Sequence, residues 1–353
     1  MKKNKVLNIE TNEISTETKV SMKTRIISAI IGIAIVIPCV IFGNFFTIAL
    51  VTVLMFVAMY ELIRCAKQMY RFYLFVIMLV ISALLTFWPF FRNLFEYIQS
   101  ENDAYSWKFY INFDHIYISI VVLALAAFVL FFMVVLHSSF TVRDACFLFT
   151  MIVLISLGLQ SLLYLRFAPM DVHYVKLGYA EPEKFFNFFD NFQSAELLLF
   201  VALSTALADT GAYFVGIFFG RNKMNERISP KKTWEGFIGG LIISSAICSA
   251  LGIILASCGL PMMEKVFDLE HCYNIVALSL IIPVMSTLGD FVFSSIKRFY
   301  DIKDFGKVIP GHGGILDRID SLVFASITTA IYVNIASSLV FMENIFLWWK
   351  FAY

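Results

Sequence analysis

Three aspartates near the C-terminal end of the chain have a spacing that suits a shared site. Asp290 precedes Ser294 by four residues and Lys297 by seven, so a helix would place these three side chains on one face. Asp317 and Asp320 are three residues apart and would share the face of a second helix. Several carboxylates in one site favour a hard divalent cation, which prefers oxygen ligands. The pattern therefore predicts a metal site at Asp290, Asp317 and Asp320.

Cationic side chains and a glycine-rich run lie among these aspartates. The cations suit phosphate groups and are Lys297, Arg298, Lys303, Lys307 and Arg318. Gly311, Gly313 and Gly314 flank His312, and such small residues let backbone N–H groups approach an anion closely. His312 is a candidate general base, and it fits equally well as a group that orients a phosphate or caps a turn. Acids, cations and a glycine loop together indicate metal-assisted phosphoryl or nucleotidyl transfer.

A second polar stretch, 208–236, interrupts the apolar sequence upstream. It contains Asp209 and, nearer its end, Ser229, Lys232 and Thr233. Hydroxyls, lysines and free N–H groups at a helix N-terminus would form an anion site. The same residues also fit a helix N-cap at Ser229, followed by Pro at the first helical position, with lysines on the cytoplasmic side. Both interpretations stay open from the sequence.

Motifs and composition exclude several function classes. No G-x-x-x-x-G-K-[ST] run is present, so the chain lacks a P-loop. The six Cys lack the Cys and His spacing of zinc sites, and no nucleophile and base of the hydrolase type stand out. The formal net charge is +1, which gives no basic field for a polyanion. Nucleic acid is therefore not an expected partner.

The elements that must hold these residues are membrane helices. The chain has 353 residues, of which 60% are hydrophobic and only 15% are charged, whereas a soluble domain is about 25% charged. A helix of about 20 apolar residues crosses a bilayer. Nine such runs predict an all-α, polytopic integral membrane protein. The runs lie at 24–43, 45–63, 72–91, 116–136, 144–165, 195–219, 236–257, 273–296 and 321–342.

The distribution of Lys and Arg sets the predicted orientation. With the N-terminus in the cytoplasm and all nine runs spanning, 20 of the 27 Lys and Arg lie on the cytoplasmic side. This topology puts the C-terminus and the loops 92–115 and 166–194 outside, and both polar stretches at the cytoplasmic face. The predicted parts are a disordered cytoplasmic tail, a set of about five N-terminal helices and a set of about four catalytic C-terminal helices. Their ranges are 1–22, 23–194 and 195–353.

Two pairs of small or turn residues predict how neighbouring helices meet. Gly43 and Asn44 separate the first two apolar runs, which predicts a tight hairpin between two helices. Gly216 and Gly220 form a small-xxx-small pair, which is typical of closely packed membrane helices.

The run from Ser294 to Asp320 resembles the phosphatidate cytidylyltransferase family, the CDP-diacylglycerol synthases. Its shared positions read Ser294-x-Ile296-Lys297-Arg298-x4-Lys303-Asp304-x-Gly306-x2-Ile309-Pro310-x-His312-Gly313-Gly314-Ile315-x-Asp317-Arg318-Ile319-Asp320. Upstream, the chain is also similar to that family at Asp209-x3-Tyr213, Gly216-x3-Gly220 and Ser229-Pro230-x-Lys232-Thr233-x-Glu235-Gly236. The resemblance covers the C-terminal half of the chain, whereas residues 1–195 resemble the family only as a row of spans.

This resemblance implies a reaction, its cofactors and its location. CTP and phosphatidic acid would give CDP-diacylglycerol and pyrophosphate, in phospholipid biosynthesis, by Mg²⁺-assisted in-line nucleotidyl transfer. A monovalent cation such as K⁺ would accompany Mg²⁺, and a homodimer is compatible with the family. The partners would be the two substrates and the lipid bilayer. The expected location is the inner membrane of a bacterial cell, with the active site facing the cytoplasm.

The resemblance also implies roles for individual residues. The expected catalytic residues are Lys297, Arg298, His312 and Arg318. The expected metal ligands are Asp290, Asp317 and Asp320, with Asp209 and Asp304 as additional candidates. The expected substrate-binding residues are Ser229, Lys232, Thr233, Ser294, Lys303, Gly311, Gly313 and Gly314.

Two alternatives stay open at this point. A related membrane enzyme that uses CTP, either another cytidylyltransferase or a lipid kinase, would have a similar composition and a different acceptor or product. A cation-coupled transporter would use Asp209 and Asp290 as ion sites, would contain inverted repeats and would not depend on CTP. The concentration of acids and lysines at one predicted cytoplasmic end favours the enzyme.

Overall fold

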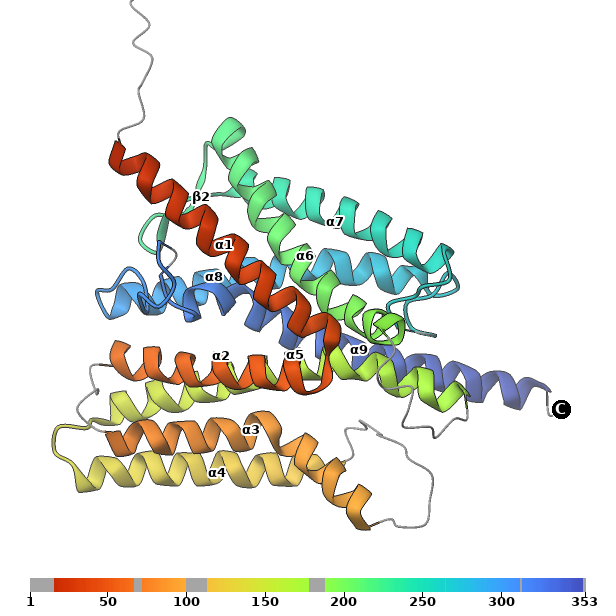
Figure 1. The fold of residues 1–353 in the computed structure, drawn as a ribbon, viewed down its shortest axis with the longest axis horizontal. Coiled ribbons are helices and arrows are strands. Elements are labelled where there is room, and N and C mark those ends of the chain that lie inside the picture. Colours follow the sequence, from red (N-terminus) through yellow and green to blue (C-terminus); the bar gives the residue numbers. More distant parts are fainter. Residues whose placement is uncertain are drawn as a thin grey trace, which may run out of the picture.

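The computed structural model describes residues 16–66, 72–99, 113–177, 188–263, 265–311 and 313–351. Within these ranges the chain forms nine α-helices and one two-stranded hairpin (Figure 1). The elements are α1 (Thr16–Phe42), α2 (Asn44–Cys65), α3 (Phe72–Gln99), α4 (Phe113–Leu136), α5 (Val142–Leu177), α6 (Phe188–Phe219), β1 (Lys223–Asn225), β2 (Ser229–Thr233), α7 (Trp234–Ser257), α8 (Cys272–Phe299) and α9 (Leu316–Phe351). The predicted helical architecture is confirmed, and the hairpin was not predicted.

Six of the described helices are long and apolar enough to cross a membrane. These are α2 and α5 to α9, and the apolar parts of α1, α3 and α4 are shorter, at Ile27–Phe42, Phe72–Trp88 and Ile120–Leu136. Large apolar side chains such as Phe128 and Phe218 are exposed on the outer surface, as expected for helices that lipid surrounds. The chain is therefore an integral membrane protein, and spanning by α1, α3 and α4 stays a prediction.

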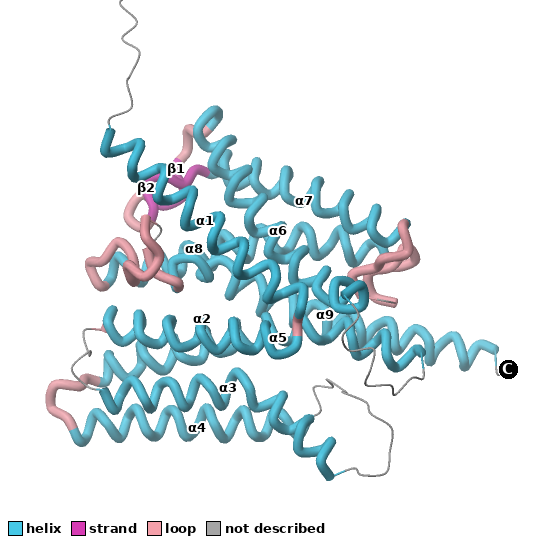
Figure 2. The backbone as a smooth tube through the Cα atoms, in the orientation of Figure 1, coloured by secondary structure: helices cyan, strands magenta, loops and turns pink. Residues whose placement is uncertain are grey.

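The helices run back and forth between two sides of the molecule (Figure 1). On the left of Figure 2 lie the loop before α5, the β1–β2 hairpin and the loop between α8 and α9, whereas the loop between α7 and α8 lies on the right. The two polar stretches of the sequence therefore reach the same side of the molecule. This alternation is the arrangement that the predicted topology requires.

Small residues allow α6 and α7 to pack closely. A Cβ added at Gly240 or Gly236 of α7 would lie 2.5 Å or 2.7 Å from a carbonyl oxygen of α6. A Cβ at Gly216 of α6 would lie 3.2 Å from the Thr233 hydroxyl oxygen. A Cβ at Gly220, directly after α6, would collide with the Gly216 carbonyl oxygen and would lie 2.8 Å from the Thr233 hydroxyl oxygen. The predicted role of Gly216 and Gly220 in helix packing is confirmed, since van der Waals contact replaces the hydrophobic effect between membrane helices.

The predicted helix start at Ser229 and Pro230 is wrong. Both residues belong to β2, which pairs antiparallel with β1. α7 begins at Trp234, and the Thr233 hydroxyl accepts a hydrogen bond from the Gly236 N–H at 3.1 Å. Thr233 has an extended backbone and a side-chain oxygen, which is the combination that an N-cap requires. It therefore takes the capping position that the sequence pattern assigned to Ser229.

Several helices extend into segments that were predicted to be loops or a tail. α1 begins at Thr16, so the end of the predicted tail 1–22 is helical, and residues 1–15 lie outside the described ranges. α5 continues to Leu177 and α6 begins at Phe188, which leaves little of the predicted loop 166–194. The loop 92–115 shortens in the same way, because α3 and α4 enter it from both ends. The apolar runs alone underestimate these helices, since polar turns can continue a helix beyond its apolar part.

Gly43 forms the predicted tight hairpin between α1 and α2, with a φ of +66°. Arg166 of α5 is fully buried against this turn, where its Nε donates to the Val40 carbonyl oxygen at 2.6 Å and its Nη2 to that of Ile41 at 3.2 Å. A Cβ at Gly43 would collide with the guanidinium. Arg166 was predicted to be a cation of an outside loop, and it instead caps the carbonyl groups at the end of α1.

Helices from both predicted parts of the chain pack against one another. α5 contacts α9 as well as α2 and α3, and α1 contacts α6. The division into 23–194 and 195–353 stays a prediction about organisation. The polar site described next draws side chains from both parts.

Candidate active site

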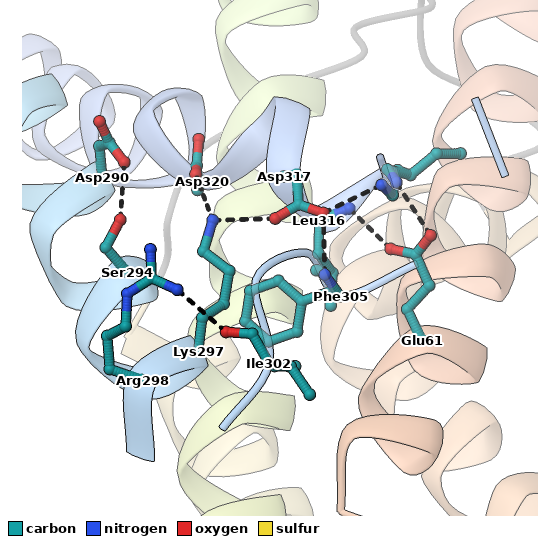
Figure 3. Close-up of polar contacts among 12 residues, drawn as sticks. Glu61, Asp290, Ser294, Lys297, Arg298, Ile302, Phe305, Leu316, Asp317 and Asp320 are labelled. Carbon is teal, nitrogen blue, oxygen red and sulfur yellow. Dashed lines mark hydrogen bonds and ion pairs between the residues drawn. The ribbon is translucent and has the colours of Figure 1, made fainter. Parts of the chain in front are cut away.

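Lys297, near the end of α8, lies at the centre of the polar site (Figure 3). Its Nζ donates to Asp317 Oδ1 at 2.8 Å and lies 3.9 Å from Asp320 Oδ2. The Lys297 and Asp320 side chains are 10% exposed and that of Asp317 only 3%. One turn earlier in α8, the Ser294 hydroxyl donates to Asp290 Oδ1 at 3.2 Å. The predicted shared helix faces are therefore confirmed, and the structure places the two faces opposite each other.

Asp317 holds together the start of α9 and the loop that precedes it. While its Oδ1 binds Lys297, its Oδ2 accepts the N–H groups of Phe305 and Gly314, each at 2.9 Å. These hydrogen bonds tie the end of α8, the middle of the loop and the start of α9 to one carboxylate. Asp317 is therefore a structural centre of the site as well as a candidate ligand.

The glycine-rich run forms a tight turn beside Asp317. Gly311 and Gly313 have φ values of +75° and +87°, which other residues rarely adopt, and the Ile309 N–H donates to the Gly313 carbonyl oxygen at 3.0 Å. A Cβ at Gly313 would lie 3.1 Å from Asp317 Oδ2 and 3.4 Å from Asp304 Cβ. This places Asp304 at the edge of the site. His312 lies outside the described residues.

Glu61 of α2 is a member of this cluster that the sequence analysis missed. Its side chain is fully buried, and its two carboxylate oxygens accept the N–H groups of Ile315 and Leu316 at 3.0 Å and 2.9 Å (Figure 3). The loop amides at Gly314, Ile315 and Leu316 thus bind carboxylates of the protein. A usable signal existed, because a lone acid within an apolar span is costly and marks a functional position.

The first polar stretch joins the second through Lys232 and Asp290. The Lys232 ammonium forms an ion pair with Asp290 Oδ2 and lies 4.5 Å from the centre of the Phe291 ring. Asp209 of α6 interacts electrostatically with Asp290, Lys232 and Arg318. The β1–β2 hairpin, α6, α8 and α9 therefore contribute charged side chains to one cluster. This agrees with the prediction that both polar stretches reach the same side of the membrane.

Not every residue that was predicted to be catalytic or substrate-binding points into this cluster. Thr233 is buried as the cap of α7, and Ser229 lies in β2. Arg298 is turned toward backbone at the rim, where Nε donates to the Ile228 carbonyl oxygen at 3.3 Å and Nη1 to that of Ile302 at 3.2 Å. Lys303, Lys307 and Arg318 are exposed near the loop between α8 and α9.

Glu235 is a second residue whose role the sequence analysis did not assign. Its carboxylate accepts the N–H groups of Arg221 and Asn222 at 3.1 Å, and the Asn222 side-chain amide at 2.7 Å. It therefore closes the base of the hairpin that carries Lys232.

The central acids have the ligand chemistry of a divalent-cation site, but the structure does not arrange them as one. Carboxylate oxygens from Asp290, Asp317 and Asp320 are the ligand type that Mg²⁺ prefers, and the lysine ammonium between Asp317 and Asp320 shows that this position favours positive charge. The three acids are not drawn together as a closed ligand set. Within the described ranges, one group of possible ligand atoms lies within 4.8 Å, and it is formed by Asp268, Glu270 and His271 in the loop between α7 and α8.

Comparison with known proteins identifies similar sequences along almost the whole chain. The sequence profile of the "Cytidylyltransferase family" matches residues 23–336. A protein named phosphatidate cytidylyltransferase from Staphylococcus saprophyticus is 30% identical over 305 residues, covering 86% of this chain and 95% of its own length. The protein of the same name from Staphylococcus epidermidis is 29% identical over 307 residues, with the same coverage. That of Staphylococcus aureus strain COL is 39% identical over 160 residues, covering 45% of this chain and 55% of the other.

Proposed function

Because the chain belongs to the cytidylyltransferase family, we propose that it transfers the CMP group of CTP to phosphatidic acid, giving CDP-diacylglycerol and pyrophosphate. The family match over residues 23–336, and the similarity over 86% of the chain to a protein named phosphatidate cytidylyltransferase, support this function. The observation that carries the placement of the site is the ion pair between Lys232 and Asp290, beside Lys297 and Asp320, because it joins both family-like stretches into one charged centre.

The reaction needs charge neutralisation more than a strong base. A phosphate oxygen of phosphatidic acid attacks the α-phosphorus of CTP, the new P–O bond forms, and the bond to pyrophosphate breaks with its electron pair on the leaving group. A phosphate monoester is already an anion at neutral pH, since its second pKa is near 6. The obstacle is repulsion between two polyanions, which lysine and arginine side chains offset. Lys232, Lys297, Arg298 and Arg318 are the proposed phosphate-binding cations.

The proposed cofactor is Mg²⁺, accompanied by a monovalent cation such as K⁺. Asp290, Asp317 and Asp320 would hold the divalent ion, with Asp209 and Asp304 as further acids at the edge. When bound, such an ion neutralises phosphate oxygens and stabilises the charge of the transition state. Addition of a chelator should abolish turnover, and added Mg²⁺ should restore it, as measured by release of pyrophosphate. Full activity in the presence of excess chelator would contradict the proposal.

The proposed topology puts the N-terminus and the active site at the cytoplasmic face of a bacterial inner membrane and the C-terminus outside. Two observations support it: the bias of Lys and Arg toward one side, and the location of the hairpin and the α8–α9 loop on the same side of the molecule (Figure 2). CTP would then enter from the cytoplasm and phosphatidic acid from the bilayer. A homodimer is proposed on the family resemblance alone.

The reaction can be tested with CTP labelled at two positions. Purified protein is incubated with phosphatidic acid vesicles, Mg²⁺ and CTP labelled at either the α- or the γ-phosphate. Transfer of α-label to the lipid phase is expected, whereas γ-label in the lipid would indicate a lipid kinase. Vesicles with diacylglycerol in place of phosphatidic acid test for a different acceptor. Absence of lipid label from both forms of CTP would overturn the proposed function.

A further inference from the structure

The buried carboxylate of Glu61 lies against the end of the α8–α9 loop and the start of α9, directly before Asp317. It accepts the N–H groups of Ile315 and Leu316, at the first turn of α9. These amides have no partner within the helix, and they form the positive end of its dipole. A carboxylate therefore stabilises this helix start, both as a hydrogen-bond acceptor and through its negative charge. Asp317, one residue after Leu316, is thereby held at a defined position.

Two glycines make room for this carboxylate. A Cβ at Gly306 would collide with Glu61 Oε1, and a Cβ at Gly314 would lie 2.5 Å from both carboxylate oxygens. The α8–α9 loop thus folds over Glu61 from both ends. Asp317 closes the same loop from the other side through the Phe305 and Gly314 amides.

The contact joins parts of the chain that are far apart in sequence. Glu61 and Ile315 are separated by 254 positions. Glu61 is in α2, one of the helices outside the family-like C-terminal stretches, and α2 has no other acid within its length. The orientation of the acid pair on α9 therefore depends on the N-terminal helices.

We propose that Glu61 is a positioning residue for the reaction, an inference that rests on the proposed function. It holds the start of α9 and the α8–α9 loop so that Asp317 and Asp320 face Lys297 and the substrate phosphates. Glu61 itself does not contact the reacting atoms. Removal of such supporting groups around a site typically lowers activity by about 10- to 100-fold.

The test compares Glu61→Gln with a matched control, Glu196→Gln, in the full-length protein. Gln has the same size, but its amide nitrogen cannot accept one of the two backbone N–H groups. Glu196 of α6 is also buried, and its carboxylate has no hydrogen-bond partner among the described residues. Its substitution therefore removes a buried acid without releasing the loop. We expect kcat of Glu61→Gln to fall about 10- to 100-fold, with KM values for both substrates within about threefold, and kcat of Glu196→Gln to stay near that of the wild type.

Hydrogen–deuterium exchange provides the second readout. In Glu61→Gln, peptides covering 305–316 should exchange at least about tenfold faster, while peptides of α6 and α7 keep their wild-type rates. If Glu61→Gln does not fold, Gly306→Ala should give the same signature, because its Cβ displaces the carboxylate without removing it. Wild-type kcat or unchanged loop exchange in the folded variant would overturn the proposal, as would an equal loss of kcat in Glu196→Gln. If the wild-type protein itself forms no CDP-diacylglycerol, the proposed function fails, and the exchange measurement still tests the role of Glu61.

Discussion

At the scale of single residues, the ion pairs of Lys297 dominate the site. Helical spacing predicted which side chains share a face, and Asp290 with Ser294 and Asp317 with Asp320 lie as that spacing required. Spacing within one segment carries no information about contacts between segments. Spacing therefore could not connect Glu61 to Ile315 and Leu316, although its position as a lone acid in an apolar run was a usable signal. The ion pair between Lys232 and Asp290 was predicted only insofar as both residues were expected at the same face of the membrane.

Substitution of Lys297 should damage both stability and activity. Lys297→Met would leave Asp317 and Asp320 without their buried cation, and loss of one partner of such a pair costs about 3–5 kcal/mol. We also expect turnover to fall at least about 100-fold, because a phosphate-binding charge is lost. Thermal unfolding in detergent and the α-label assay measure the two effects. The control is Lys265→Met, at an exposed position of the α7–α8 loop, and equal behaviour of both variants would contradict the assignment.

The two metal-site candidates Asp290 and Asp317 should respond differently to the same change. Asp290→Asn should lose activity at least about 100-fold with little effect on the unfolding temperature, because its side chain is 29% exposed and its ion pair is partly solvated. Asp317→Asn should lose activity and also lower the unfolding temperature, since Asp317 binds Lys297 and two loop amides. Near-wild-type turnover in both variants would mean that the metal site is misplaced.

At the scale of elements, long apolar runs predicted the nine described helices, and polar segments were interpreted less well. Ser229 and Pro230 were assigned to a helix start because Pro favours the first helical turn. Pro is equally compatible with an edge strand, and pairing of β2 with β1 decided between the two. The last residue of α5 and the first residue of α6 were predicted wrongly, because apolar content indicates the membrane-spanning part of a helix and not its full length.

The glycines between α6 and α7 give a prediction at this scale. Gly240→Ala would place a Cβ 2.5 Å from a carbonyl oxygen of α6, so the two helices must move apart. Overpacking of this kind costs about 1–3 kcal/mol, and the shift should also weaken activity, because β2 and Lys232 lead directly into α7. Gly32→Ala is the matched control, since a Cβ there meets nothing within 4 Å. Thermal unfolding of both variants is the measurement. Equal unfolding temperatures would contradict the prediction, because they would show that α6 and α7 accommodate the added Cβ without loss of stability.

At the scale of the whole molecule, the scarce charges explain both the fold and the location of the site. A chain with 15% charged residues in a membrane can place few of them cheaply. Lys and Arg outside the spans orient the helices, and the acids of the polar site are bound by cations or backbone amides. Lys232 and Lys297 pair with Asp290 and Asp317, and Glu61 accepts backbone N–H groups. These contacts lie at the side of the molecule that carries the hairpin and the α8–α9 loop (Figure 2).

The sidedness of the molecule can be tested with a thiol reagent that does not cross membranes. Two variants are expressed in bacterial cells, each with a single cysteine in an otherwise Cys-free chain. One retains Cys258 of the exposed α7–α8 loop, and the other carries Lys231→Cys in β2. The bias of Lys and Arg predicts that Cys258 reacts in intact cells, whereas position 231 reacts only after the membrane is permeabilised. The reverse pattern would invert the topology and place the polar site away from cytoplasmic CTP, and the proposed function would then require another source of nucleotide.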